Sequence, residues 1–210
     1  MLCCNNHKHN RNDKMEHLYN HAAIGYANLW WRQDRLFLKR MKDKDMTAMA
    51  ATLGDIATAY SVIRGIPDGR RYAGWDDTAK KLLSMKKLSA STYVHAVDQL
   101  QSELVKTRKL MSAASKILWF HSKSPVKIFD KRAADALDFK NGSYLDYCGR
   151  WSSEFKQSEE AILRAIEKLI QHIDCTTIPP AGRDEFYDVV NQKWFAERVF
   201  DKYLWEKGGK

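Results

Sequence analysis

Hydrophobic positions along the chain recur with helical spacing over most of its length. Between residues 13 and 42 they return every three or four positions, as one face of an α-helix requires. They are Met15, Leu18, Ala22, Tyr26, Leu29, Leu36 and Phe37. Pro is rare, with four occurrences, so long stretches lack a helix breaker. The same reasoning predicts further helices over 45–64, 75–85, 91–104, 113–121, 130–137, a long segment after 142, and 184–205. The pattern therefore predicts an all-α fold.

One stretch does not follow the helical pattern. Ser124 and Pro125 interrupt it, and residues 126–129 are apolar without helical spacing. The next helix is expected to begin at Asp130, whose carboxylate would accept hydrogen bonds from free backbone N–H groups at the helix N-cap. An extended linker is therefore predicted to deliver an aspartate to the start of a helix.

A chain of 210 residues is long enough for one domain with a real core. We expect a polar, disordered segment over 1–12 and a single compact helical domain over 13–210, with the option of two helical lobes around a cleft. No apolar run approaches the roughly 20 residues that span a bilayer, and no secretory signal is visible. We therefore expect a cytoplasmic protein without a membrane partner.

The four cysteines, Cys3, Cys4, Cys148 and Cys175, are irregularly spaced and are expected to be free thiols. Cys3 and Cys4 with His7 and His9 are conceivable metal ligands, but their spacing fits no zinc pattern. We expect neither a metal nor another cofactor. The formal net charge of +9 attracts polyanions without naming one.

The most informative segment joins Ser112-Ala-Ala-Ser-Lys-Ile-Leu-Trp-Phe-His121 to Pro125-Val-Lys-Ile-Phe-Asp-Lys-Arg-Ala133. A lysine opens an apolar helix, a Pro-Val linker follows, and an aspartate opens the next helix. This arrangement resembles the helix-hairpin-helix DNA glycosylase superfamily, in particular its 8-oxoguanine glycosylase-like branch. The Gly-rich hairpin of that family, which grips a phosphate, is replaced here by residues 110–114, and the interval from lysine to aspartate is short.

The segment from Arg198 to Trp205 is similar to the closing helix of small bacterial members of that superfamily. Some of those proteins act in defence against phages, and one removes glucosylated 5-hydroxymethylcytosine from phage DNA. The resemblance implies an enzyme that flips a modified base out of double-stranded DNA and excises it, leaving an abasic site. It also implies a monomer, because the family consists of single-domain proteins. The alternative substrate is an oxidised purine in base-excision repair.

The resemblance implies two catalytic residues, Asp130 and Lys116. Breaking an N-glycosidic bond builds positive charge on the sugar, and a fixed carboxylate stabilises it or activates water. If the lysine amine attacks instead, an imine forms and the strand can be cut by a lyase step. The simpler interpretations are an ordinary N-cap aspartate and a solvated or phosphate-binding lysine. Ser112 and Ser115 are expected to cap their helix.

A flipped base needs an apolar or aromatic pocket, and each candidate for it is equally well explained as a core residue. The candidates are Tyr26, Trp30, Trp31, Trp119, Phe120 and His121. Phosphates would be held by a basic set, which is otherwise a solvated face. Its members are Lys123, Lys127, Lys131, Arg132, Arg70 and Arg71.

Three hypotheses of different classes follow. The first is the DNA glycosylase, which requires Asp130 in a basic cleft beside a pocket. The second is a non-catalytic helical DNA-binding module, for which Asp130→Asn would be harmless. The third is a helical interaction protein that shows no salt-dependent binding to DNA.

Overall fold

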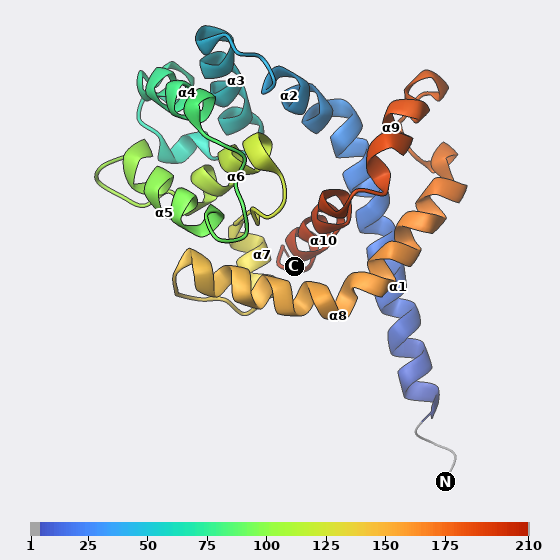
Figure 1. Cartoon of the computed structure of the whole chain (residues 1–210). Coiled ribbons are helices and arrows are strands. Elements are labelled where there is room, and N and C mark those ends of the chain that lie inside the picture. The colour runs from blue at the N-terminus through green and yellow to red at the C-terminus, as the bar shows by residue number, and fades with distance from the viewer. Residues whose placement is uncertain (1–4, 210) are drawn as a thin grey trace. The chain divides into compact units, whose positions relative to one another are not determined.

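The structure, a computed structural model, describes the backbone of residues 5–209 and the side chains of residues 16–209. Across the described residues the elements are helices joined by turns, without a strand (Figure 1), which confirms the predicted all-α fold. The side chains of Cys3, Cys4, His7 and His9, and part of the segment 1–12 that was expected to be disordered, lie outside these residues. Among the described residues, no helix is long and apolar enough to cross a membrane.

The chain divides into two compact units, and neither is continuous in sequence. Unit 1 comprises residues 1–32, 132–138 and 150–210. Unit 2 comprises residues 33–131 and 139–149. The chain therefore passes from one unit to the other four times.

Unit 1 is organised around two helices from opposite ends of the sequence, α1 (Asn5–Leu29) and α10 (Lys193–Lys207). They lie side by side, blue and dark red in Figure 1. The ring of Tyr19 lies 4.6 Å from that of Tyr203, and Tyr26 lies 5.0 Å from Phe195, measured between centroids. A Cβ added at Gly25 would come within 3.0 Å of Lys202 Cε, so the absence of a side chain there allows the close approach. Unit 1 also holds α9 (Arg183–Val190) and most of α8 (Tyr144–Gln171).

Unit 2 is built on α3 (Met46–Ala59) and α6 (Met111–Ser122). Every residue from Ala113 to Phe120 is buried, as expected for the central helix of a unit rather than for one on its surface. The helices packed around this pair are α2 (Arg35–Arg40), α4 (Gly74–Ser84) and α5 (Tyr93–Leu104). The segment 124–130 then leads to α7 (Lys131–Ala136) and is neither helix nor strand, as predicted.

The predicted helix boundaries needed three corrections. The first predicted helix contains a π-helical turn at Trp30–Asp34, which local spacing does not reveal. The helix predicted to reach residue 64 ends at Ala59, because Ser61 adopts a left-handed conformation (φ 55°). The predicted helix 184–205 is two helices: Gln192 between α9 and α10 is extended (ψ 140°), next to Asn191, a poor helix former.

Candidate active site

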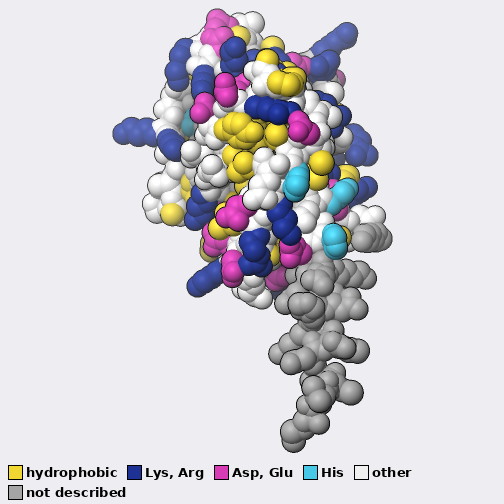
Figure 2. Space-filling view, turned by 90° about the vertical axis from the view of Figure 1, so that its right-hand side faces the viewer, with side chains coloured by type: hydrophobic (Ala, Val, Ile, Leu, Met, Phe, Trp, Pro, Cys, Tyr) yellow, Lys and Arg dark blue, Asp and Glu magenta, His cyan; other side chains and the backbone are white. Residues whose placement is uncertain are grey.

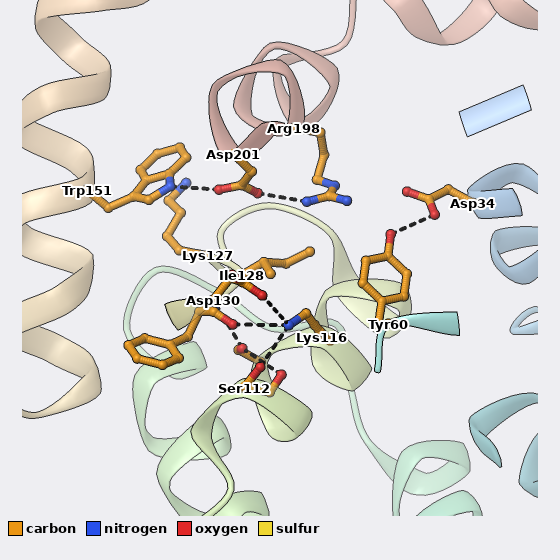
Figure 3. Close-up of polar contacts among 12 residues, drawn as sticks. Asp34, Tyr60, Ser112, Lys116, Lys127, Ile128, Asp130, Trp151, Arg198 and Asp201 are labelled. Carbon is orange, nitrogen blue, oxygen red and sulfur yellow. Dashed lines mark hydrogen bonds and ion pairs between the residues drawn. The ribbon is translucent and has the colours of Figure 1, made fainter. Parts of the chain in front are cut away.

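Lys116 and Asp130, which are 14 positions apart in the sequence, meet in unit 2. The Lys116 Nζ atom lies 3.1 Å from Asp130 Oδ2 (Figure 3). Lys116 is in the middle of the buried helix α6, and Asp130 immediately precedes α7. The lysine side chain is 4% exposed and the aspartate side chain 28%. The ion pair thus has a buried cation and a carboxylate that solvent can reach.

Other acceptors surround the Lys116 amine. It donates to Ser112 Oγ at 2.7 Å and lies 3.5 Å from the carbonyl oxygen of Phe129. The ring of Tyr60 lies 6.0 Å from Nζ, at the outer limit of a cation–π contact. Tyr60 in turn donates its hydroxyl to Asp34 Oδ1 at 2.7 Å. The ammonium group is therefore held by hydrogen bonds in a polar environment within the core.

The backbone leading to Asp130 is held by side chains from two helices. Ser115 Oγ on α6 accepts a hydrogen bond from the N–H of Phe129 at 3.0 Å. Tyr144, at the start of α8, both accepts from the N–H of Lys127 at 3.0 Å and donates to its carbonyl at 2.6 Å. Tyr147 donates to the carbonyl of Ile128 at 2.9 Å. These bonds replace the helix or sheet hydrogen bonds that the backbone of this segment lacks. They fix the position of Asp130 just ahead of α7.

Ser112 and Ser115 do not cap α6, contrary to expectation. The N-cap position is Leu110, and no side chain caps it. Ser115 instead donates to the carbonyl of Ser112 at 3.3 Å, while Ser112 accepts from Lys116. The two hydroxyls bind the lysine and the linker, because both face the interior of unit 2.

The structure contradicts the simpler interpretation of Lys116 as a solvated or phosphate-binding lysine, because its side chain is 4% exposed. An attacking amine must be neutral and must reach the sugar, whereas this amine is buried and donates to a carboxylate, a hydroxyl and a carbonyl. A lysine in this position acts on the orientation of Asp130. The carboxylate has the exposure and the fixed position that stabilisation of a developing cation requires.

The predicted base-pocket residues of unit 2 lie on α6 with different environments. Trp119 and Phe120 are 1% and 3% exposed. Phe120 packs edge-on against Phe37 and Tyr60 at 5.6 Å each, which is the geometry of a core aromatic cluster. His121 is half-buried and its Nδ1 lies 2.7 Å from Ser122 Oγ.

The predicted base-pocket residues of unit 1 are also packed against other aromatic side chains. Trp30 is 2% exposed, and its ring lies 5.7 Å from that of Phe186. Tyr26 is fully buried under the guanidinium group of Arg198, which lies 5.0 Å from the ring centroid. Trp31 is half-buried against Gly182, where an added Cβ would come within 2.2 Å of the indole.

The six predicted phosphate-binding side chains differ in how accessible they are. Lys127 is 9% exposed and Lys123 is half-buried. Lys131, Arg132, Arg70 and Arg71 are exposed. Arg70 pairs with Asp55, and the guanidinium group of Arg132 lies 4.3 Å from the ring of Trp205.

Charges of both signs share the face of the molecule that Figure 2 presents. Lys and Arg side chains there are interspersed with Asp and Glu.

Within the part of the chain whose side chains are described, no group of three or more His, Cys, Asp or Glu residues could hold a metal ion. Cys148 is buried and Cys175 exposed, both as free thiols.

The C-terminal segment that carries part of the resemblance holds buried charges. On α10, Arg198 Nη1 lies 3.0 Å from Asp201 Oδ2, and both side chains are less than a tenth exposed. The indole N–H of Trp151 donates to Asp201 Oδ1 at 2.8 Å. The sequence alone did not predict this pairing, although an arginine and an aspartate three positions apart on a helix are a visible signal. Comparison of the chain with protein-family models, curated proteins and solved structures gave no match.

Proposed function

We propose that this protein is a DNA glycosylase that uses Asp130 to excise a flipped, modified base from double-stranded DNA. The observation that carries the proposal is the ion pair between Lys116 and Asp130, which presents a fixed and partly exposed carboxylate at the start of α7. The net charge of +9 supports a polyanionic partner.

Asp130 acts on the sugar and on water. As the N-glycosidic bond breaks, its carboxylate stabilises the positive charge that develops at the sugar and orients the attacking water. The ammonium group of Lys116 keeps this carboxylate in one orientation, so that little reorganisation is needed during the reaction. Water is the nucleophile, and the product is an abasic site in an uncut strand.

The proposed substrate is a glucosylated 5-hydroxymethylcytosine of phage DNA, and the proposed setting is anti-phage defence. This part rests on the resemblance of residues 112–133 and 198–205 to the defence glycosylases. An oxidised purine is the alternative substrate.

The decisive experiment measures base release from duplexes that contain 8-oxoguanine, uracil, 5-hydroxymethylcytosine or its glucosylated form. The key variant is Asp130→Asn, which keeps the size of the side chain and removes its charge. Its matched control is Asp77→Asn, an exposed carboxylate in the first turn of α4. We expect Asp130→Asn to slow release by about 100- to 1000-fold, the usual effect of losing one preorganised electrostatic group, and the control to react like the wild type.

Strand analysis with and without alkali separates the two roles of Lys116. We expect wild-type product strands to break only after alkali, and borohydride to trap no covalent complex. Trapping that is lost in Lys116→Gln but retained in Lys131→Gln would make Lys116 the nucleophile. Absence of release from every duplex, despite tight salt-sensitive binding, would replace the proposal with a non-catalytic DNA-binding module.

A further inference from the structure

Four lysines lie on three separate segments of unit 2 that meet at the C-terminal part of α6, where Phe37 of α2 packs against Phe120. Lys42 and Lys44 are in the turn after α2, Lys87 follows α4, and Lys123 follows the last residue of α6. We call these four residues the lysine cluster. The N–H of Leu88 donates to Ser122 Oγ at 3.2 Å, which fixes the segment after α4 to the end of α6.

The side chains in the cluster interact through their like charges. Burial lowers the pKa of Lys123, and the positive charges of Lys42 and Lys87 lower it further. Burial likewise lowers the pKa of the neighbouring His121, with a smaller contribution from Lys44. Each of these groups therefore lies within electrostatic range of another cation.

Among the described residues, neither Asp43 nor Asp45 forms an ion pair with Lys42, Lys44 or Lys87. Asp45 Oδ1 accepts from the N–H of Ala48 at 2.7 Å, and Asp43 Oδ1 accepts from the N–H of Asp45 at 3.0 Å. Lysines at helix C-termini compensate the negative end of the helix dipole, which accounts for one or two cations at this position. It does not account for four, of which Lys42 and Lys87 repel Lys123 and Lys44 repels the proton of His121.

We propose that the lysine cluster binds the sugar–phosphate backbone of double-stranded DNA and is a contact surface separate from Asp130. The choice of DNA rests on the proposed function. Lys42, Lys44 and Lys87 are exposed and therefore accessible to phosphates. Among the phosphate contacts predicted from sequence, only Lys123 belongs to this cluster.

The spacing within unit 2 suits one duplex that reaches both places. Lys116, which holds Asp130, lies in the middle of α6, and Lys123 lies just beyond its end. The seven residues between these positions span roughly 10 Å at the α-helical rise per residue. Nucleotides recur about every 3.4 Å along each strand of DNA. The cluster would therefore contact phosphates roughly three nucleotides from the excised base.

The test measures binding of an unmodified, fluorescein-labelled 20-base-pair duplex by anisotropy at several NaCl concentrations. The cluster variant is Lys42→Gln/Lys44→Gln/Lys87→Gln, which leaves the half-buried Lys123 in place. The control variant makes the same change of charge at three exposed lysines elsewhere. It is Lys80→Gln/Lys106→Gln/Lys156→Gln.

Each phosphate contact contributes about 0.9 to the slope of log affinity against log salt concentration. We expect the cluster variant to lower the magnitude of this slope by about 2 to 3, and its affinity at about 0.1 M NaCl to fall at least tenfold. The control is expected to keep a slope near the wild type. Equal losses in both variants, or an unchanged slope in the cluster variant, would overturn the proposal.

Base release, measured separately, keeps the two proposals distinguishable. If the wild type excises a base and the cluster variant binds DNA normally, the glycosylase proposal stands and the proposed role of the lysine cluster is refuted. Binding that depends on the cluster, without release from any duplex, would retain the cluster and reject the glycosylase. If the wild type did not bind the duplex at all, double-stranded DNA would be excluded as the partner of the lysine cluster.

Discussion

Replacing Tyr144 by Phe tests whether the linker ahead of Asp130 is held as the structure indicates. The hydroxyl of Tyr144 serves both the N–H and the carbonyl of Lys127, at 3.0 and 2.6 Å, and the side chain is fully buried. Burial raises the pKa of Tyr144 well above its ordinary value, so the hydroxyl remains a donor throughout the neutral range.

The Tyr144→Phe variant leaves two backbone groups buried without that partner. A buried donor or acceptor that loses its partner costs about 1 to 3 kcal/mol, so for two such groups the free energy of unfolding should fall by about 2 to 6 kcal/mol. With a urea slope of about 3 kcal/mol/M, the midpoint should fall by about 0.7 to 2 M. Tyr147→Phe removes a single bond, to Ile128, and should cost about half as much.

Urea unfolding monitored by far-UV circular dichroism gives these midpoints. The matched control is Tyr187→Phe, because Tyr187 is 39% exposed, and we expect it to change stability by less than about 0.5 kcal/mol. If Tyr144→Phe were as stable as this control, the hydroxyl would not hold the linker, and the account of how Asp130 is positioned would be refuted.

Three further predictions concern other parts of the chain. Burial raises the pKa of Cys148 to about 11. In a variant whose two N-terminal cysteines are replaced by Ser, we therefore expect Ellman's reagent at pH 8 to react quickly with the exposed Cys175 and with Cys148 only after unfolding. Fast reaction of both thiols in the folded protein would contradict this. Burial lowers the pKa of His121 below its ordinary value of 6.5, so the unfolded chain binds the proton more tightly and stability should fall as pH drops below about 6.5. Urea midpoints between pH 7 and 5 should show a shallower decline in His121→Gln than in the exposed control His95→Gln, and equal declines would refute the assignment. Asp45→Ala removes the side-chain cap of α3 and should cost about 1 kcal/mol; an unchanged thermal midpoint would show that the cap contributes nothing.

Helical spacing predicted the fold class and most helices because it reports which face of an element is buried. It did not reveal the π-helical turn at Trp30–Asp34 or the break at Gln192, since the spacing of apolar residues does not by itself mark where a helix becomes irregular or ends. Element boundaries are decided by a few residues, and tertiary contacts override their propensities.

The pairing of Lys116 with Asp130 follows the pattern of residues that carried the resemblance, although the catalytic roles remain proposals. The side chains that hold this ion pair in place could not be predicted from the neighbouring sequence. Tyr144 and Tyr60 act from 14 positions or more along the chain on Asp130 and Lys116, and a tyrosine on a helix gives no sign of which backbone atom it will meet. Ser115 looked like a capping residue because that is the commonest role of serine near a helix start.

The packing of α1 against α10 bears on how the chain matures on the ribosome. Residues near 26 leave the ribosome long before their partners near 195. At about 5 to 20 residues per second, α1 waits roughly 10 to 30 s for the helix that covers it. Through that interval Tyr19 and Tyr26, which end buried, lack the rings of Tyr203 and Phe195 that they pack against. Unit 1 can thus be completed only after α10 has left the ribosome, and until then its nascent form exposes these side chains to aggregation or to a chaperone.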